Sequence, residues 1–361
     1  MTTPDRSRGA RLAAHGTVSA ALSRCSDRRL RELVDAGTAI GSGIGGATVL
    51  LDVEGMPVFV KQVRLTDLER RPENVGSTAN LFGLPDFCHY GVGIIGGPGF
   101  GAWRELAAQV MTTDWVLAGE YEGFPLMYHW RELPDAGQPL PEELADVDHA
   151  VAYWGGGPEI RHRIEAVQQS SASLVLFLEY IPQNLHDWLD VQVRAGDEAA
   201  ERACALVEDE LAAGIAFMNA RGLLHFDAHF QNILTDGDRL YFADYGLAIS
   251  SGFELTPGES AFFDEHQDYD RYYAATHLVN WLAVALYGHG PEERRAFVRA
   301  CAEGVPPEGV PPALAAALLR HAPVAAVVGD FYRAFQRQSR ETPYPLEAVS
   351  RIGRDRIGRP G

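Results

Sequence analysis

Short apolar runs with β-branched residues alternate with turn signals in the first part of the chain. Residues 57–63 form one such run, which predicts a strand because valine and phenylalanine fit a pleated, half-buried surface. A glycine-rich stretch at 40–46 leads into a second apolar segment, which ends at a turn formed by Glu54 and Gly55. The pattern predicts neighbouring strands on either side of these turns.

The second part of the chain changes to helical spacing. Residues 201–221 carry apolar positions three and four residues apart, and Gly222 is a suitable stop for the helix that they predict. Asp236 and Gly237 stand between two short apolar runs, which indicates a β-hairpin. Further helices are expected at 291–340. The apolar stripe of the first helix consists of Leu206, Val207, Leu211, Ile215 and Met218.

The length of 361 residues and the hydrophobic share of 46% allow a full core and favour two domains. We expect an α+β fold with an antiparallel sheet in one domain and mainly helices in the other. The sheet domain is expected at 37–180, with an insertion near 64–100, and the helical domain at 181–345. Residues 1–36 are expected to form a partly flexible extension, and residues 346–361 an irregular tail.

The N-terminal residues, the most apolar segment and the cysteines indicate the cellular compartment in which the protein is expected. The first 20 residues are basic and lack an apolar stretch, so they predict a flexible arm and not a secretory signal. The most apolar segment, 311–329, is interrupted by Arg320 and His321, so no membrane span is expected. Four scattered cysteines without a CxxC pair favour a reducing compartment, and we expect a cytoplasmic protein.

The formal net charge of −18 disfavours nucleic acid and anionic membranes as partners and favours cationic ones. An anionic ligand therefore requires local positive charge. The chain contains a single lysine, Lys61, among 31 basic residues, and it lies in the predicted strand at 57–63. A lysine among apolar neighbours is expected to pair with an anion. The alternative is a lysine that stands on an edge strand by chance.

Two glycine patterns of the form GxGxxG precede a helix predicted from about residue 102. The first pattern, Gly41, Gly43 and Gly46, lies between two predicted strands, as a hairpin lid over phosphates would. Glycines there would let the backbone approach phosphate oxygens. The second pattern leads into the helix, as in a dinucleotide-binding site, but no clear strand precedes it. We interpret this second pattern as a glycine-rich loop with the glycines Gly91, Gly93 and Gly96.

Three polar residues flank the predicted hairpin. Asp227 and Asn232 precede it and Asp244 follows it, so the hairpin is expected to bring the two ends of this segment together. Phosphoryl transfer needs a carboxylate that orients or deprotonates the attacking hydroxyl. It also needs hard oxygen ligands that hold magnesium against the phosphates. Asp227 fits the first role, and Asn232 and Asp244 fit the second.

These residues resemble the signature of the protein-kinase-like superfamily. His225, Asp227 and Asn232 form an HxDxxxxN catalytic loop, and residues 244–248, DYGLA, resemble the magnesium-binding DFG segment with tyrosine in place of phenylalanine. With the first glycine pattern and the single lysine, the resemblance covers residues 37–285. It implies a two-lobed fold, ATP and Mg²⁺ as cofactors, and transfer of the γ-phosphoryl group to a hydroxyl.

The resemblance assigns further site residues. A helix glutamate is expected to pair with Lys61, and we favour Glu105, which implies a long insertion before it. The alternative is that Glu105 is a solvated glutamate in the first turn of its helix. Residues 173–181 resemble the last strand and the hinge of the first lobe. Backbone groups near Glu179 and Ile181 are therefore expected to face adenine.

The catalytic loop departs from protein kinases at two positions. Phe226 stands where an arginine is usual, so a switch through a phosphorylated activation loop is not expected. His229 resembles the histidine of aminoglycoside phosphotransferases and is expected to contact the γ-phosphate or the acceptor; a structural histidine is the alternative. The segment 268–273 resembles a buried helix of the second lobe, and one of its aspartates is expected to brace the catalytic loop.

The sequence therefore predicts an ATP-dependent kinase. A small molecule or natural-product peptide is favoured as the acceptor, because the segment after Asp244 is short and offers little platform for a protein. The negative net charge suits a cationic acceptor. A Ser/Thr protein kinase is the first alternative, since the glycine loop and the DYGLA segment resemble those enzymes. A nucleotide-binding regulator with little catalysis and another transfer chemistry on the same fold also remain open.

Overall fold

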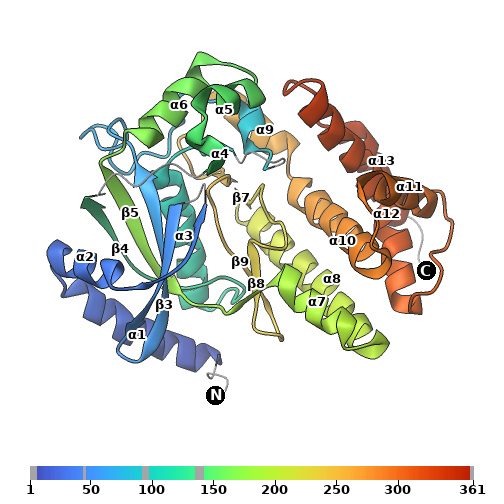
Figure 1. Cartoon of the computed structure of the whole chain (residues 1–361), viewed down its shortest axis with the longest axis horizontal. Coiled ribbons are helices and arrows are strands. Elements are labelled where there is room, and N and C mark those ends of the chain that lie inside the picture. The colour runs from blue at the N-terminus through green and yellow to red at the C-terminus, as the bar shows by residue number, and fades with distance from the viewer. Residues whose placement is uncertain (1–5, 44–45, 92–96, 135–141, 358–361) are drawn as a thin grey trace. The chain divides into compact units, whose positions relative to one another are not determined.

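The chain forms two compact units, one rich in strands and one mainly helical, which confirms the mixed α+β class (Figure 1). The first unit consists of residues 1–181 and 243–257, and the second of residues 182–242 and 258–361. The computed structural model describes residues 6–43, 46–91, 97–134 and 142–357.

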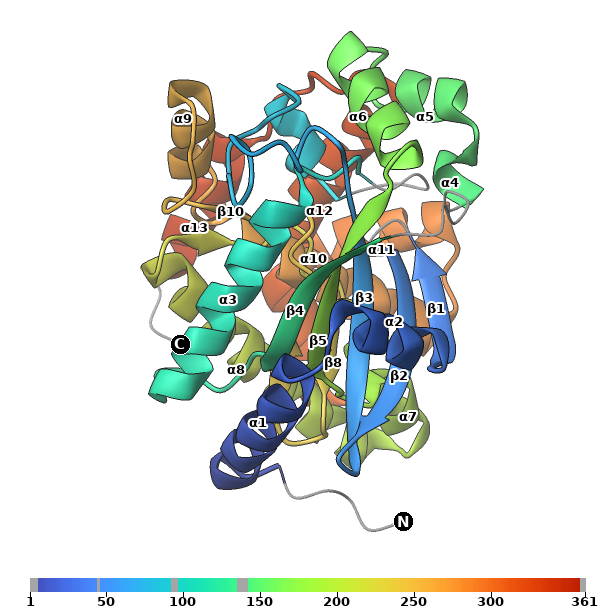
Figure 2. The same ribbon diagram turned by 90° about the vertical axis from the view of Figure 1, so that its left-hand side faces the viewer.

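A five-stranded antiparallel sheet organises the first unit, with β3 at its centre and the order β1-β2-β3-β5-β4 (Figure 2). Glu54 and Gly55 both have positive φ angles, 55° and 78°, in the turn that joins β2 to β3. Such turns match the twist of antiparallel strands. The strands are β1 Thr38–Gly43, β2 Gly46–Val53, β3 Met56–Leu65, β4 Met127–Pro134 and β5 Ala172–Glu179.

Helix α3, Ala102–Ala118, packs against one face of this sheet. Side chains alternate between the two faces of a strand, so Lys61, Val63 and Leu65 share a face. The pairing of Lys61 with Leu176 places that face beside alternate residues of β5. Lys61 therefore points toward α3. The apolar core on this face consists of Val63, Leu65, Ala102, Trp103, Leu106, Met127, Leu174, Leu176 and Leu178.

The expectation of a flexible arm over the first 20 residues is wrong. Residues 8–23 form helix α1, Arg8–Ser23, and Ser7 caps it by accepting a hydrogen bond from the Ala10 N–H at 3.3 Å. The helix packs on β4 and buries Val18 and Leu22. A second helix, α2 Asp27–Asp35, follows it. Residues 1–5 of the expected arm lie outside the described residues.

Arg11 ties α1 to the end of the sheet. Its guanidinium forms a paired contact with the Glu179 carboxylate, with Nε to Oε1 at 2.9 Å and Nη2 to Oε2 at 2.8 Å. The same guanidinium donates to the carbonyls of Glu122 and Phe124. The Arg11 side chain is 2% exposed and the Glu179 side chain 8%. The charge pair is therefore fully hydrogen-bonded and shielded from water.

Two connections complete the first unit. The expected insertion lies between β3 and α3 as residues 66–101, and its only helical or strand element within the described residues is the 3₁₀ helix η1, Asp86–His89. Three helices lie between β4 and β5, and one short strand lies in the segment 243–257. These are α4 Glu142–Ala145, α5 Val147–Tyr153, α6 Pro158–Gln168 and β10 Ile249–Ser250.

The second unit confirms the predicted helix at 201–221 and the predicted hairpin. Helix α8, Asp197–Ala220, buries its apolar stripe except for the half-buried Leu206, and β8 pairs with β9 around the turn at Asp236 and Gly237. Helix α13, Leu346–Ile357, contradicts the irregular tail, of which residues 358–361 lie outside the described part. The other elements are β6 Gln183–Asn184, α7 Leu185–Arg194, β7 Leu223–Leu224, β8 Ile233–Thr235, β9 Leu240–Phe242, α9 Pro257–Glu265, α10 Tyr269–Tyr287, α11 Pro291–Ala302 and α12 Pro312–Arg337.

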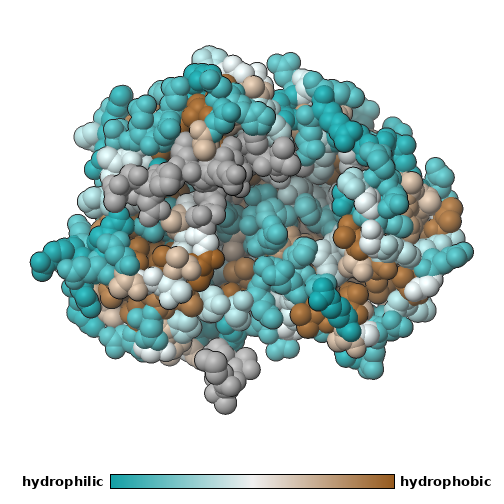
Figure 3. Space-filling view, in the orientation of Figure 1, coloured by the Kyte–Doolittle hydropathy of each residue, from teal (hydrophilic) through white to brown (hydrophobic). Residues whose placement is uncertain are grey.

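Helix α12 is long and apolar enough to cross a membrane by length and composition. It packs on α10 and α11 and buries apolar side chains such as Leu318, Val328 and Phe335. Hydrophilic residues dominate the face of the molecule seen in Figure 3, and hydrophobic residues form separate small patches there. Length and composition of this one helix are weak evidence for a membrane span.

Replacement of Arg11 by alanine is expected to destabilise the protein by about 3 kcal/mol, because it leaves the buried Glu179 carboxylate without its counter-ion. Urea unfolding of the wild type and the variant measures this loss. The exposed Arg28, whose side chain is 89% exposed and 3.9 Å from Glu32, provides the matched control. Arg28→Ala should cost no more than about 0.5 kcal/mol. Equal effects at the two sites would contradict the structural role of the Arg11 contact.

Candidate functional site

The structure brings three of the predicted site residues together in the first unit. Lys61 Nζ lies 2.6 Å from Glu105 Oε1 and 2.8 Å from Asp244 Oδ1. The side chains of Lys61 and Glu105 are nearly inaccessible, whereas that of Asp244 is 38% exposed. The single lysine of the chain is thus a buried, paired residue of the sheet face under α3, and the chance edge-strand alternative is excluded.

The electrostatics of this cluster follow from two carboxylates that share one ammonium group. Burial alone would lower the pKa of Lys61, but the adjacent carboxylates of Asp244 and Glu105 outweigh it and raise that pKa. Burial raises the pKa of Glu105, and Asp244 adds to this, while Lys61 partly offsets it. The charged cluster carries a formal charge of −1, so its partly exposed carboxylate, Asp244, remains suited to a cation.

Asp244 itself is held in an unusual backbone conformation. Its φ angle is +66°, a region that non-glycine residues rarely adopt. The Gly246 N–H donates to Asp244 Oδ1 at 3.3 Å, and the Lys61 ammonium contacts the same oxygen. The local strain is therefore offset by contacts to the Asp244 carboxylate, which is typical of residues at functional sites.

Tyr245, the residue after Asp244, is a buried tyrosine with a hydrogen-bonded hydroxyl. Its ring is 1% exposed, and its hydroxyl is hydrogen-bonded to Thr112 of α3. Burial raises the pKa of this hydroxyl, so it stays protonated at neutral pH. The segment after Asp244 is thereby attached to the helix that carries Glu105.

The first glycine pattern lies at the end of the β1–β2 hairpin, as predicted. Strand pairing places Gly43 opposite Gly46, with residues 44–45 outside the described part. A Cβ at Gly46 would lie 1.9 Å from the Gln62 carbonyl oxygen, and the φ angle there is +111°. Contact with β3 therefore requires glycine at position 46. A Cβ at Gly41 would meet Thr48 Oγ1 at 3.1 Å, a tight but less severe contact.

The second glycine pattern does not follow a strand. Gly93 and Gly96 lie outside the described residues, and the segment before Gly91 is the 3₁₀ helix η1. A dinucleotide-binding fingerprint requires a strand before its glycines. The interpretation of this segment as a glycine-rich loop is therefore favoured over the dinucleotide-binding alternative.

Glu179 and Ile181 stand at the end of β5, but the Glu179 N–H is already used. It donates to the carbonyl of Leu126 at 2.7 Å, and the Glu179 carboxylate accepts from the Leu126 N–H as well as from Arg11. This N–H therefore has a partner within the chain, and the expectation that backbone groups near Glu179 and Ile181 face adenine remains a prediction. Ile181 is buried at 5% exposure, and its role toward adenine remains a prediction.

Asp227, His229 and Asn232 form a second group, which lies in the second unit. Asn232 Nδ2 donates to Asp227 Oδ2 at 3.0 Å and to the Asp227 carbonyl at 3.1 Å. These bonds orient the Asp227 carboxylate and leave the Asn232 Oδ1 oxygen as the atom that could bind a hard cation. The Tyr273 hydroxyl approaches Asp227 Oδ1 at 3.4 Å. Sequence reasoning missed this tyrosine.

The backbone around Asp227 is braced by a buried aspartate, as expected. Asp270 accepts from the N–H groups of His225 at 2.6 Å and Phe226 at 2.8 Å. Burial raises the pKa of Asp270 to about 6, although these two hydrogen bonds act in the opposite direction. Phe226 has a φ angle of +62°, and its ring stacks on Tyr269 and Phe262. Phe226 is thus held in place by its aromatic neighbours and by Asp270.

His229 lies beside Asp227, and its backbone N–H donates to the Asp227 carbonyl at 2.8 Å. Its Nδ1 accepts from the Gln231 N–H at 3.2 Å, which puts the proton of the neutral ring on Nε2. Nε2 lies 3.8 Å from Asp227 Oδ1. The His229 side chain is 27% exposed. Both predicted roles, toward a ligand and in the local loop structure, are compatible with this geometry.

Neither group alone is a metal centre. Within the described residues, no three His, Cys, Asp or Glu side chains are arranged to hold a metal ion. Magnesium often keeps water and takes substrate phosphate oxygens as ligands, so one or two protein oxygens suffice. The Asp244 carboxylate and the Asn232 amide oxygen fit that donor chemistry.

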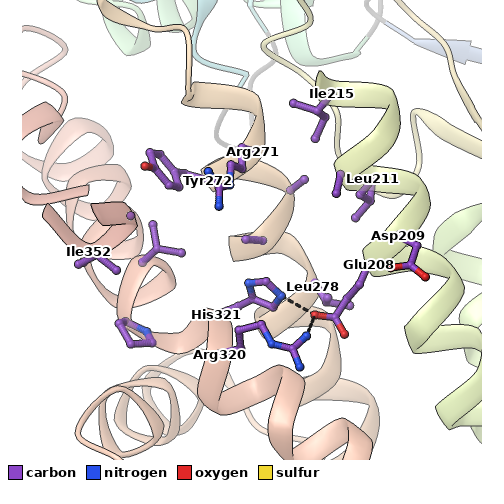
Figure 4. A pocket seen from close by; sticks show the side chains of 16 residues that line it. Glu208, Asp209, Leu211, Ile215, Arg271, Tyr272, Leu278, Arg320, His321 and Ile352 are labelled. Carbon is purple, nitrogen blue, oxygen red and sulfur yellow. Dashed lines mark hydrogen bonds and ion pairs between the residues drawn. The ribbon is translucent and has the colours of Figure 1, made fainter. Parts of the chain in front are cut away.

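A separate groove lies among α8, α10, α12 and α13 in the second unit, with a volume of about 1250 Å³ (Figure 4). Glu208 lies at one end and contacts Arg320 and His321, the latter at 2.7 Å. Leu211, Ile215 and Leu278 contribute to its apolar lining. None of the residues predicted for phosphoryl transfer lines this groove.

No protein-family model matches the chain, and no curated protein sequence does so.

Replacement of Lys61 by methionine is expected to make stability fall as pH rises. Without the ammonium, burial and the Asp244 charge would raise the pKa of Glu105 further above its unfolded value. The folded variant then binds the Glu105 proton more tightly than the unfolded chain does. It loses stability as pH increases through the window between the two pKa values, by about 1.4 kcal/mol for each unit of difference.

Urea unfolding of Lys61→Met and the wild type at pH 5 and pH 7.5 measures this dependence. The variant should lose more stability than the wild type between the two pH values. Arg70→Met, which removes a cation paired with the half-exposed Glu132, is the control and should show no added pH dependence. A Lys61→Met variant with the pH profile of the wild type would contradict the shared charge cluster.

Proposed function

We propose that the chain is an ATP- and Mg²⁺-dependent phosphotransferase, a kinase that transfers the γ-phosphoryl group of ATP to a hydroxyl. The observation that carries the proposal is the cluster of Lys61, Glu105 and Asp244. The single lysine of the chain is buried against two carboxylates on a sheet face, and one of these carboxylates, that of Asp244, is partly exposed. A buried ammonium in such a place is suited to phosphate oxygens, and an accessible carboxylate is suited to the accompanying cation.

The proposed fold is that of the protein-kinase-like superfamily, with the two units as its two lobes. The antiparallel sheet, the helix α3 inserted between β3 and β4 in the sequence, and the mainly helical second unit support this assignment. The catalytic-loop pattern His225, Asp227 and Asn232 supports it independently.

The proposed chemistry divides between two groups of residues. The Lys61 ammonium, held by Glu105, would bind phosphate oxygens of ATP. Asp244 and Asn232 would hold Mg²⁺, which neutralises developing negative charge on the phosphates when it is bound. Asp227 would orient the acceptor hydroxyl and take its proton as the acceptor oxygen forms its bond to the γ-phosphorus. The bond from that phosphorus to the bridging oxygen breaks, and ADP leaves.

The acceptor is proposed to be a small, cationic molecule or a natural-product peptide. Between Asp244 and the start of α9 at Pro257 the chain is short, and Leu247 and Glu254 in this stretch are hydrogen-bonded to the insertion. Little of this segment remains to bind an extended protein substrate. The net charge of −18 favours a cationic acceptor by long-range attraction.

Asp227→Asn is expected to lower turnover at least about 100-fold while the affinity for ATP changes less than about twofold, because this carboxylate acts on the acceptor proton. Turnover is measured as ADP release with Mg-ATP and a panel of aminoglycosides and basic Ser/Thr peptides. Binding of Mg-ATP is measured by calorimetry.

Asp238→Asn is the matched control, since Asp238 is an exposed aspartate in the β8–β9 turn. It should leave both turnover and affinity unchanged. Full turnover by Asp227→Asn would refute the role given to that carboxylate. Mg-ATP binding by the wild type without transfer to any acceptor, together with no ADP release, would favour a nucleotide-binding regulator.

A further inference from the structure

The insertion at residues 66–101 contacts two segments that carry residues of the Lys61 cluster, namely α3 and the segment that follows Asp244. It lies between β3, which carries Lys61, and α3, which carries Glu105. Its described residues, 66–91 and 97–101, also contact the segment that follows Asp244. These contacts are all within the first unit.

The first contact fixes the beginning of α3. Glu69 is 1% exposed, and its Oε1 accepts from the Ala102 N–H at 2.6 Å. Its Oε2 accepts from the Thr66 N–H at 3.0 Å and from Arg163 Nη1 at 3.1 Å. A carboxylate at a helix N-terminus satisfies an N–H group that has no partner in the helix and interacts favourably with the helix dipole. Glu105 lies one turn away, so this contact helps to fix its position.

Gly101 shows how closely the insertion approaches the helix. Its φ angle is +132°, and a Cβ there would lie 2.8 Å from Glu69 Oε1. The indole N–H of Trp103 donates to the Glu69 carbonyl at 2.9 Å. The end of the insertion and the start of α3 therefore form one hydrogen-bonded structure around Glu69.

The second contact holds the chain just after Asp244. His89 is fully buried, and its Nδ1 lies 2.8 Å from the Leu247 carbonyl oxygen, to which it must donate because a carbonyl only accepts. The His89 ring stacks on Phe100, with ring centres 3.7 Å apart and planes 11° apart. The stack fixes the orientation of the imidazole and therefore the position of its donor.

The third contact lies further along the same segment. Glu254 Oε2 accepts from the Ser77 hydroxyl and from the Thr78 N–H, the latter at 3.0 Å. The Glu254 N–H donates to the Thr78 hydroxyl at 2.9 Å. Arg104 of α3 donates to the Thr78 carbonyl at 2.6 Å, and its guanidinium lies over the Phe253 ring. The insertion thus connects α3 to the segment 247–254.

We infer that the described residues of the insertion, 66–91 and 97–101, form a permanent brace that positions Glu105 and Asp244 for magnesium and phosphate binding, without a covalent switch. The inference rests on the proposed function and assigns a positioning role to His89 and Thr78. Because Asp244 is attached to the braced segment, release of that segment should first affect the carboxylate proposed to bind Mg²⁺. Release should have less effect on binding of ATP in the absence of the metal.

His89→Phe tests the brace, because phenylalanine keeps the stack on Phe100 and removes the donor to Leu247. The Mg²⁺ concentration for half-maximal ADP release should rise about tenfold, the size expected for one lost buried hydrogen bond. The dissociation constant for ATP without magnesium should stay unchanged. Treatment of the wild type with a protein phosphatase should leave turnover unchanged.

Two further variants provide a control and an independent test of the brace. His289→Phe is the matched control, since His289 also stacks on an aromatic ring, Tyr287, at an interplanar angle of 11° and lies outside the brace. It should leave the Mg²⁺ dependence unchanged. Thr78→Val with Glu254→Gln weakens the brace at a partly exposed place that does not threaten folding, and it should raise the same Mg²⁺ concentration.

Hydrogen exchange of the ligand-free protein separates failure of the brace from failure of the proposed function. Amides of residues 247–254 should exchange faster in both brace variants than in the wild type and in His289→Phe. Unchanged exchange, or an unchanged Mg²⁺ dependence in an active enzyme, would overturn the inference. Faster exchange in both brace variants, combined with a wild type that releases no ADP and binds no Mg-ATP, would support the brace and refute the proposed kinase activity.

Discussion

The structure of the candidate site depends on one constraint, the burial of a lysine that must keep its charge. An ammonium removed from water is tolerated only when anions replace its hydration. Lys61 meets this need with Glu105 at 2.6 Å and Asp244 at 2.8 Å. The three residues come from β3, from α3 and from the segment 243–257, so the pairing fixes three distant parts of the chain at once. Disruption of any one of these elements leaves a buried charge unpaired.

Two residues of the candidate sites adopt left-handed backbone conformations, which cost non-glycine residues about 1–2 kcal/mol each. Asp244 is compensated by the Lys61 and Gly246 contacts, and Phe226 by the hydrogen bond from its N–H to Asp270. In each case a charged side chain on a neighbouring element compensates for the strain. The positions of Asp244 and Asp227 are therefore set by buried ion and hydrogen-bond partners, not by local preference for a turn.

Features with a local signal could be predicted from the sequence. The helical spacing before Gly222 and the Asp-Gly turn at 236–237 give α8 and the β8–β9 hairpin, because each depends on residues close together in the chain. The apolar strand around Lys61 predicted an anionic partner, and the resemblance to the protein-kinase-like superfamily indicated Glu105 as that partner. That resemblance also predicted an aspartate that braces the segment around Asp227, and Asp270 accepts from the N–H groups of His225 and Phe226 there.

Features that depend on distant irregular segments could not be predicted. Arg11 and Glu179 are 168 residues apart, and no periodicity connects them. The basic N-terminal segment has no strong amphipathic pattern, so its helix could not be predicted. Burial of Arg11, Val18 and Leu22 against the rest of the chain stabilises that helix. The contacts of the insertion at 66–101 with Leu247 and Glu254 arise from a segment with little regular structure. Composition gives no indication of such pairings.

The most direct test of the central claim is thermal unfolding with and without saturating Mg-ATP, for the wild type and Asp244→Asn. A ligand present at 100 times its dissociation constant stabilises the folded state by about 2.7 kcal/mol. The account predicts a clear rise in the unfolding midpoint for the wild type, and loss of the magnesium-dependent part of that rise in Asp244→Asn. No rise in the wild type, or an equal magnesium-dependent rise in the variant, would contradict the assignment of Lys61, Glu105 and Asp244 as a nucleotide and magnesium site.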